Sequence, residues 1–270
     1  LRHIGCPKVW CFHHEHPQSI SIKGFTKIIV YFIKLLSKLT KPKAVFLTTK
    51  AFDNHVKYGF KFGEIKIIDN GVDVIRFKID TDIRRKIRKG FCITQNDDIF
   101  VIGNVARWSP IKNHEFLFQV VSNLNFTNFR LVLAGVEIRE DNMDLLALID
   151  LYGLRDKVIL LGERNDINEI MCSFDLHMLP SKMEGFGLAT AEAMACGVPC
   201  VATDVGCQKE IISKYGFVGT TSELSAFTKH VNDVYLLSSI ERLKLSSACR
   251  SHIEKNYSCQ KMAHEYFTFI

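Results

Sequence analysis

The sequence lacks any long uncharged apolar run, and this absence argues against a helix that crosses a membrane. Its longest candidate, from Ile28 to Leu39, is interrupted by Lys34 and Lys38, whereas a membrane-crossing helix needs about 20 predominantly apolar residues. We also find no internal repeat, no low-complexity stretch and no recognisable signal peptide. The remaining composition, 47% hydrophobic and 24% charged residues over 270 positions, is that of a globular protein with a substantial core.

Paired cysteine motifs are absent as well. The nine cysteines are scattered and form neither a C-x-x-C pair nor a zinc-ligand spacing. They are therefore expected to be reduced thiols packed in a cytoplasmic protein. The net charge of +6 suits a polyanionic ligand, an anionic membrane surface or nucleic acid, and charge alone does not choose among them.

Continuous apolar runs alternate with helical patterns from about Asp97 onward, which predicts an α/β fold. Strands are expected over 99–105, 129–134, 158–161, 175–179 and 199–202, and helices over 113–124, 141–151, 167–174 and 188–196. Runs that are apolar on both faces indicate a parallel, doubly wound sheet covered by helices on each side. Such sheets bind ligands beyond the carboxyl ends of their strands, so we expect the chemistry in the loops that follow strands.

Residues 1–80 carry a weaker pattern of the same kind. Strand-like runs at 9–12, 44–48 and 65–68 and a helix over 24–39 are too few for a complete α/β domain. Because the chain also begins with Leu, we expect it to start inside the N-terminal domain of a longer protein. Residues 81–270 then form the second domain, which ends in helices across 223–269.

The loop and helix from Ser181 to Pro199 carry the most informative motif. Two glycines follow a predicted strand and allow a tight turn, and the helix that begins near Leu188 offers free N–H groups to an anion. Glu184 on the loop and Glu192 in the helix can each accept hydrogen bonds from vicinal sugar hydroxyls. An anion site flanked by two such carboxylates fits a nucleotide sugar.

Two other interpretations of this motif are open. Gly185 and Gly187 supply two of the three glycines of a dinucleotide-binding loop, but Thr190 occupies the third position. An ordinary strand–helix turn with surface glutamates is the plainest alternative.

A second loop has a basic character. Arg107 follows the strand expected over 99–105, and Lys112 lies at the start of the next helix. A guanidinium and an ammonium at this place can neutralise a diphosphate. A solvated surface pair is the default alternative.

Taken together, these motifs resemble glycosyltransferase family 4, whose fold is GT-B. The spacing of Glu184 and Glu192 is similar to the E-x7-E signature of that family. Further similarities, in the expected order along the chain, lie at 70–73 (N-G-V-D), 103–113 (around Arg107 and Lys112), 131–135 and 205–212. The resemblance is strong from Asn70 to Ile212 and implies a doubly wound, Rossmann-like second domain beside a partial N-terminal one.

The resemblance also implies roles for individual residues. Arg107 and Lys112 bind the diphosphate and replace a metal ion at the leaving group, helped by the N–H groups of Gly187 and Leu188. Glu184 contacts the donor sugar and Glu192 the ribose. No metal or other cofactor is expected.

A histidine of the N-terminal domain faces the donor sugar in this family. His13, directly after the strand at 9–12, is the best positional match, and His14 is the second. A polar loop and a metal site that uses the histidines at 13–16 are the alternatives.

Two other segments have competing interpretations. Asp80-Thr81-Asp82 matches a D-x-D metal motif, but Asp82 is better interpreted as a helix cap. The segment 24–43 combines an apolar stripe with lysines, which predicts a core-facing helix or, alternatively, a helix on an anionic membrane surface.

We therefore expect a retaining, metal-independent glycosyltransferase that acts in the cytoplasm or at the cytoplasmic face of a membrane. Its partners would be a nucleotide sugar and a glycan or lipid-linked acceptor, as in polysaccharide or lipopolysaccharide synthesis, and no nucleic acid. A non-catalytic remnant that only binds nucleotide sugars and an epimerase of the same fold are the alternatives.

Overall fold

A computed structural model describes residues 9–12, 24–94 and 98–270. The chain forms two compact units: Leu1–Gly71 together with Cys259–Ile270, and Val72–Ser258. The division therefore falls after Gly71 instead of after residue 80, and the last helix belongs to the first unit and not to the second.

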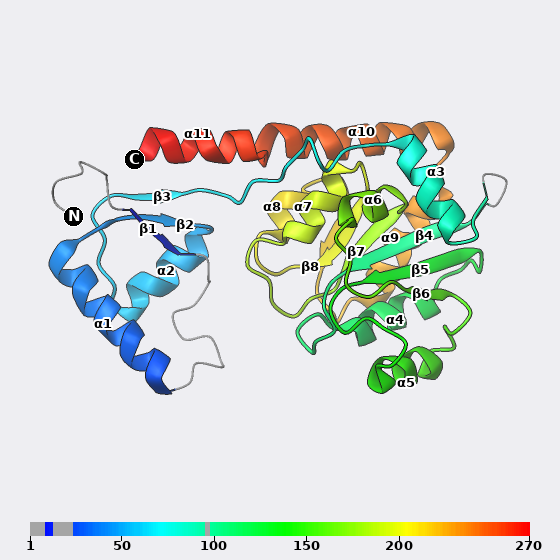
Figure 1. Ribbon diagram of the computed structural model, residues 1–270, viewed down its shortest axis with the longest axis horizontal. Helices are drawn as coiled ribbons and strands as arrows, with labels where there is room; N and C mark the ends of the chain where they lie inside the picture. Colours follow the sequence, from blue (N-terminus) through cyan, green and yellow to red (C-terminus); the bar gives the residue numbers. More distant parts are fainter. Residues whose placement is uncertain (1–8, 13–23, 95–97) are drawn as a thin grey trace. The chain divides into compact units, whose positions relative to one another are not determined.

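The first unit contains a parallel three-stranded sheet in the order β1-β2-β3 (Figure 1). Its strands are β1 (Val9–Phe12), β2 (Lys43–Phe46) and β3 (Ile65–Ile67), and its helices are α1 (Gly24–Thr40), α2 (Thr49–Tyr58) and α11 (Cys259–Phe269). All three strands lie where the apolar runs predicted them.

The two faces of this small sheet have separate cores. Phe46 and Ala44 pack with Ala51 of α2, whereas Val45 packs with Phe269 of α11. This alternation of neighbouring residues between faces is that of a strand covered on both sides. Helix α2 is an element that the sequence analysis missed.

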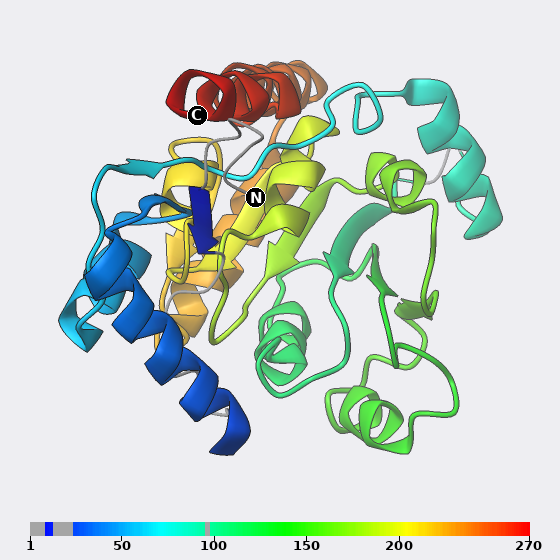
Figure 2. The ribbon, with the colours of Figure 1, turned by 60° about the vertical axis from the view of Figure 1, so that its left-hand side comes forward.

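Helix α1 has the predicted length, but it does not have the core-facing environment that was one of the two alternatives. Large apolar side chains on it are exposed, among them Phe25 (75%), Phe32 (62%) and Leu39 (77%). The N-terminal end of the helix extends clear of the other elements of its unit (Figures 1 and 2). Its apolar stripe therefore does not face a core within the described residues. No helix of the described chain has the length and apolar character that crossing a membrane requires.

The second unit is built on a six-stranded, fully parallel sheet in the order β6-β5-β4-β7-β8-β9. Its strands are β4 (Phe100–Val105), β5 (Phe129–Ala134), β6 (Val158–Leu160), β7 (Leu176–Leu179), β8 (Cys200–Thr203) and β9 (Phe217–Gly219). The prediction of a doubly wound parallel sheet is confirmed.

Eight helices are described in the second unit. They are α3 (Thr81–Gly90), α4 (His114–Ser122), α5 (Met143–Leu151), α6 (Ile167–Cys172), α7 (Leu188–Ala195), α8 (Gln208–Ile212), α9 (Leu224–Leu236) and α10 (Ser239–Asn256). Side chains of α6, α7, α8 and α10 form one apolar core, and those of α4, α5 and α9 form another. The sheet thus lies between two helical layers, as its apolar strands require.

The start of α3 corrects one prediction. Asp80, and not Asp82, caps this helix: its carboxylate accepts a hydrogen bond of 3.0 Å from the N–H of Ile83. Asp82 lies in the first turn and forms an exposed ion pair with Arg85.

Candidate functional site

The strand order of the second unit defines where a ligand fits. From β4 the chain proceeds to β5 and β6 on one side, and later to β7, β8 and β9 on the other. The loops after β4 and β7 therefore diverge at a topological switch point, where open α/β sheets form a ligand crevice. These are the two loops that the motifs singled out.

Backbone contacts hold these loops together. The N–H of Lys182 donates to the carbonyl oxygen of Ile111 at 2.7 Å. A third loop, after β8, approaches so closely that a Cβ at Gly206 would overlap the carbonyl oxygen of Gly185. Glycine is needed there because the left-handed φ of +59° and the close approach both disfavour a side chain.

The principal polar contact of the site joins Lys112 to Glu184. The ammonium nitrogen Nζ lies 2.5 Å from the carboxylate oxygen Oε1, and the two side chains are only 20% and 12% exposed. The same oxygen accepts a hydrogen bond of 2.6 Å from Ser181 Oγ. Two residues to which the sequence analysis assigned separate ligand contacts thus bind each other.

Arg107 has a different environment. It follows the end of β4, its side chain is exposed, and it forms no hydrogen bond or ion pair with any part of the chain that the structure describes. Its guanidinium is therefore free to bind an anion in the crevice. Gly135, at the end of the neighbouring strand β5, packs against the backbone of Ala106 and Arg107, where a Cβ would overlap it.

The N-terminus of α7 lies in the loop that carries Glu184. Gly187 is its N-cap, with a left-handed φ of +94° and no side-chain cap. Its carbonyl oxygen accepts hydrogen bonds from Thr190 and Ala191, while the N–H groups of Leu188 and Ala189 have no acceptor within the described residues. Unengaged N–H groups at a helix N-terminus form an anion-binding site.

Gln208 is a residue of this region that the sequence analysis missed. Its side chain is fully buried, and neither its amide oxygen nor its amide nitrogen has a hydrogen-bond partner. A Cβ at Gly187 would overlap the amide nitrogen. No pattern in the sequence distinguishes such a glutamine from a surface residue of a short helix.

Glu192 lies on α7, about one turn beyond its N-terminus. Burial raises the pKa of this carboxyl group to about 7, and the nearby charge of Arg76 partly opposes the shift. Arg76 is held by hydrogen bonds to the carbonyl oxygen of Asn165 (2.9 Å) and, more weakly, to the side chain of Asn168 (3.4 Å). The carboxyl group can therefore change its charge near neutral pH.

Two buried histidines lie near the same site and were also missed. Burial, reinforced by the charge of Lys112, lowers the pKa of His114 to about 4 and that of His177 to about 3. His177 Nε2 accepts a hydrogen bond of 3.4 Å from the N–H of Val105, whereas neither ring nitrogen of His114 has a partner. Both rings are neutral at physiological pH, so they add no positive charge beside Lys112.

The structure brings together only part of the predicted site. Lys112 and Glu184 are in direct contact, and Gly187 and Leu188 form the adjoining helix end. Within the described chain, no side-chain hydrogen bond or ion pair joins Glu192 or Arg107 to the other predicted site residues. His13 and His14 lie outside the described residues.

Comparison with known proteins places this arrangement in a family. The profile of the glycosyl transferases group 1 matches residues 86–252, and the chain belongs to that family. Among curated relatives, the N-acetyl-alpha-D-glucosaminyl L-malate synthase of Bacillus anthracis is 26% identical over 209 residues, which cover 76% of this chain and 53% of the relative.

A second relative is a UDP-Gal:alpha-D-GlcNAc-diphosphoundecaprenol alpha-1,3-galactosyltransferase of Escherichia coli, 27% identical over 73% of this chain and 51% of its own length. The chain thus spans about half the length of these two curated relatives.

Solved structures agree with the fold. Alr3699/HepE from Anabaena, in complex with UDP and glucose, has a TM-score of 0.82 at 21% identity over 97% of this chain and 71% of its own. WaaG, a glycosyltransferase involved in lipopolysaccharide biosynthesis, has a TM-score of 0.73 at 18% identity over 95% of this chain and 74% of its own. The predicted GT-B fold is confirmed.

Proposed function

We propose that this chain is the donor-binding part of a retaining glycosyltransferase of family 4, and that its donor is a UDP-sugar. The observation that carries the proposal is the convergence of Arg107, the Lys112–Glu184 pair and the open N-terminus of α7 at the topological switch point. The relatives whose names specify UDP or UDP-Gal support the choice of nucleotide. The named relatives are a synthase and transferases, which favours transfer over epimerisation.

The diphosphate would lie between the two loops. Arg107 provides a guanidinium with no internal partner, and α7 provides the N–H groups of Leu188 and Ala189 beside Gly187. Lys112 is shared between Glu184 and the incoming phosphate. Together these groups stabilise the negative charge that develops on the departing diphosphate, and this charge stabilisation is the main catalytic contribution that we assign to the second unit.

The two glutamates would bind the two sugars that flank the diphosphate. Glu184 is held by Lys112 and Ser181, so it is preorganised to accept hydrogen bonds from hydroxyl groups of the transferred sugar. Glu192, farther along α7, would accept those of the ribose. The partly buried positions of both groups strengthen such hydrogen bonds.

The reaction would proceed without a protein nucleophile or a metal ion. The acceptor hydroxyl attacks the anomeric carbon on the face from which the diphosphate departs, and an oxygen of the departing phosphate takes its proton. The resemblance to family 4 gives His13 the role of contacting the sugar. Assays in excess chelator are expected to retain activity; loss of activity that manganese or magnesium restores would contradict this part of the proposal.

The acceptor would be a glycan or a lipid-linked glycan, presented at the cytoplasmic face of a membrane. Helix α1 supports this choice because its exposed side chains include Phe25, Phe32 and Leu39 together with Lys27 and Lys38. Apolar side chains combined with lysines favour adsorption to an anionic lipid surface.

A thermal-shift panel of nucleoside diphosphates and nucleotide sugars tests the proposal. A ligand that binds the folded state raises the unfolding temperature according to its concentration relative to Kd. We expect UDP and at least one UDP-sugar to raise it more than ADP, GDP and their sugars do. An unchanged midpoint with every nucleotide would refute the donor site. Binding without transfer to any acceptor in a chain extended to the length of its relatives would identify a non-catalytic remnant.

A further inference from the structure

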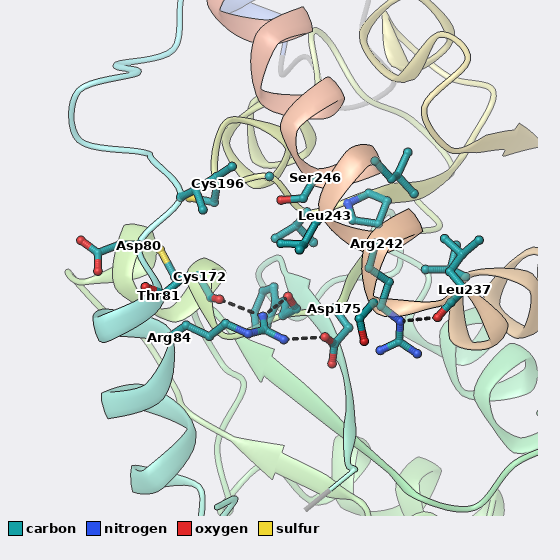
Figure 3. A pocket seen from close by; sticks show the side chains of 18 residues that line it. Asp80, Thr81, Arg84, Cys172, Asp175, Cys196, Leu237, Arg242, Leu243 and Ser246 are labelled. Carbon is teal, nitrogen blue, oxygen red and sulfur yellow. Dashed lines mark hydrogen bonds and ion pairs between the residues drawn. The ribbon is translucent and has the colours of Figure 1, made fainter. Parts of the chain in front are cut away.

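The second unit contains a cavity at the end of the parallel strands that is opposite to the proposed donor site. Its volume is about 400 Å³, and its lining includes Asp175 and Pro199, which directly precede β7 and β8 (Figure 3). The cavity therefore lies at the amino ends of these strands, whereas the crevice described above lies at their carboxyl ends. Nothing in the proposed glycosyl transfer uses it.

Two thiols line this cavity from neighbouring helices. Cys172 is the last residue of α6, and Cys196 is the C-cap of α7. Both sulfur atoms donate toward the carbonyl oxygen of Asn168, Cys172 at 3.2 Å and Cys196 at 3.8 Å. The shared carbonyl oxygen of Asn168 thus holds the two thiols close to each other. In Figure 3 Cys172 and Cys196 lie on the same side of the cavity as Asp80 and Thr81.

The surroundings make the two sulfurs chemically unequal. The nearby thiol of Cys196 lowers the pKa of the Cys172 thiol, and the charge of Arg84 adds to this effect against burial and the charge of Asp80. The nearby thiol of Cys172, together with burial, raises the pKa of Cys196. A thiol whose anion is favoured reacts first with an electrophile, so Cys172 is the nucleophile of the pair.

Access to the pair is through the cavity. The two residues are only 7% and 5% exposed, so large reagents are excluded, but a cavity of this volume admits a molecule as small as a hydroperoxide. Arg84 donates a hydrogen bond of 3.0 Å to the carbonyl oxygen of Cys172 and is anchored by Asp175 at 2.5 Å, which keeps its charge at the cavity wall.

We propose that Cys172 and Cys196 are a redox-active dithiol that closes to an intramolecular disulfide when a hydroperoxide enters this cavity. In the first step the Cys172 thiolate attacks the peroxide oxygen, the O–O bond breaks, Cys172 becomes a sulfenic acid, and hydroxide leaves and is protonated to water. In the second step the Cys196 sulfur attacks the Cys172 sulfur, the S–O bond breaks and a second water leaves. Two thiols lose two electrons and hydrogen peroxide gains them.

The disulfide would connect the C-terminal ends of α6 and α7. Cys196 terminates α7, whose opposite end is the N-terminus at the proposed donor site. Oxidation therefore ties this helix to α6 without adding a group to the crevice.

Peptide mapping of the full chain tests the proposal. Reduced protein is treated with hydrogen peroxide in a few-fold molar excess, free thiols are alkylated, and the unreduced digest is analysed by mass spectrometry. The expected product is one linked peptide pair that contains Cys172 and Cys196, lacks two hydrogen atoms, and is released by dithiothreitol. Recovery of both thiols in alkylated form, or linkage of either one to a different cysteine, would overturn the proposal.

Variants separate the two roles. Cys196→Ser is expected to leave Cys172 as a sulfenic acid that a β-dicarbonyl probe labels, whereas Cys172→Ser is expected to abolish both the linkage and the labelling at position 196. Cys249→Ala removes another buried thiol and is the matched control, in which the linked pair must persist. Equal labelling at position 196 in Cys172→Ser would contradict the assignment of the nucleophile, and loss of the pair in the control would contradict its independence from other cysteines.

Discussion

The ammonium group of Lys112 lies 2.5 Å from a carboxylate oxygen of Glu184, and this ion pair joins the loops that follow β4 and β7. Each partner is proposed to contact a different part of the donor: Lys112 the diphosphate and Glu184 the sugar. Each of the two charges neutralises the other, which limits the cost of partial burial. Substitution of either residue by a neutral one therefore also leaves the charge of its partner without neutralisation.

Glu184→Gln is predicted to separate sugar binding from diphosphate binding. The neutral amide releases Lys112, so the affinity for UDP should stay the same or rise slightly. The affinity for the UDP-sugar should fall by roughly 10-fold, because a hydrogen bond to a charged group contributes about 1.5 kcal/mol or more. Calorimetric titration of both ligands measures the two effects. Equal losses for UDP and UDP-sugar would show that Glu184 does not contact the sugar.

Glu192 is predicted to make stability depend on pH. Its pKa is raised from 4.5 to about 7 in the folded chain, so its stabilising contribution is present below pH 4.5 and is lost as the pH rises through about 7. Glu192→Gln cannot lose a proton. Between pH 4.5 and 8 the free energy of unfolding of this variant should therefore rise relative to wild type, by up to about 3 kcal/mol.

Urea denaturation at several pH values measures this difference. Glu115→Gln, an exposed position on α4, is the control for which the difference from wild type should stay nearly constant across the same range. A pH-independent difference for Glu192→Gln would mean that its carboxyl group is as well solvated as an ordinary one.

Two glycine substitutions are predicted to have different effects on folding. A Cβ at Gly103, in the central strand β4, would overlap the ring of Phe174, whereas a Cβ at Gly90 would meet nothing within 4 Å. Gly103→Ala should lower the free energy of unfolding by roughly 1–3 kcal/mol through overpacking. Gly90→Ala should be neutral or slightly stabilising, because the residue needs no left-handed backbone. Equal stabilities in denaturant would contradict the packing of β4 against Phe174.

The exposed face of α1 is predicted to bind anionic lipid. The chain should co-sediment with vesicles that contain phosphatidylglycerol and much less with pure phosphatidylcholine, and the binding should weaken at high salt. Phe32→Ser should reduce it, whereas Val56→Ser, an exposed apolar position on α2 (41% exposed), should not. Binding that is equal for both lipids and both variants would contradict a membrane role for α1.

The parts of the fold that follow from local patterns could be predicted. Strands β4 to β8 are continuous apolar runs, and a sheet buried on both faces leaves no other arrangement for them. Contacts that depend on strand order could not be predicted in the same way. The direct pairing of Lys112 with Glu184 requires β4 and β7 to be neighbours, although 70 residues lie between the end of β4 and the start of β7.

Other differences between the sequence predictions and the structure have local physical causes. The apolar stripe of α1 predicts amphipathicity but not what covers it. Asp80 and Asp82 are both acceptable caps by composition, and the extended backbone at Asp80 decides between them. Gln208 and His114 are polar residues buried by tertiary packing, for which neither periodicity nor spacing provides a signal.

The most direct test of the donor site is the affinity of UDP for Arg107→Ala, measured by calorimetric titration. Arg107 has no partner within the described chain, so its removal breaks no internal contact and the effect reports on the ligand alone. The matched control is Arg155→Ala, which removes a guanidinium that forms an exposed ion pair with Asp150. A charge-assisted hydrogen bond contributes about 1.5–3 kcal/mol, so we predict a roughly 10- to 150-fold weaker Kd for Arg107→Ala and an unchanged Kd for the control. An unchanged Kd for both variants, with wild type binding UDP, would contradict a diphosphate site at the carboxyl end of β4.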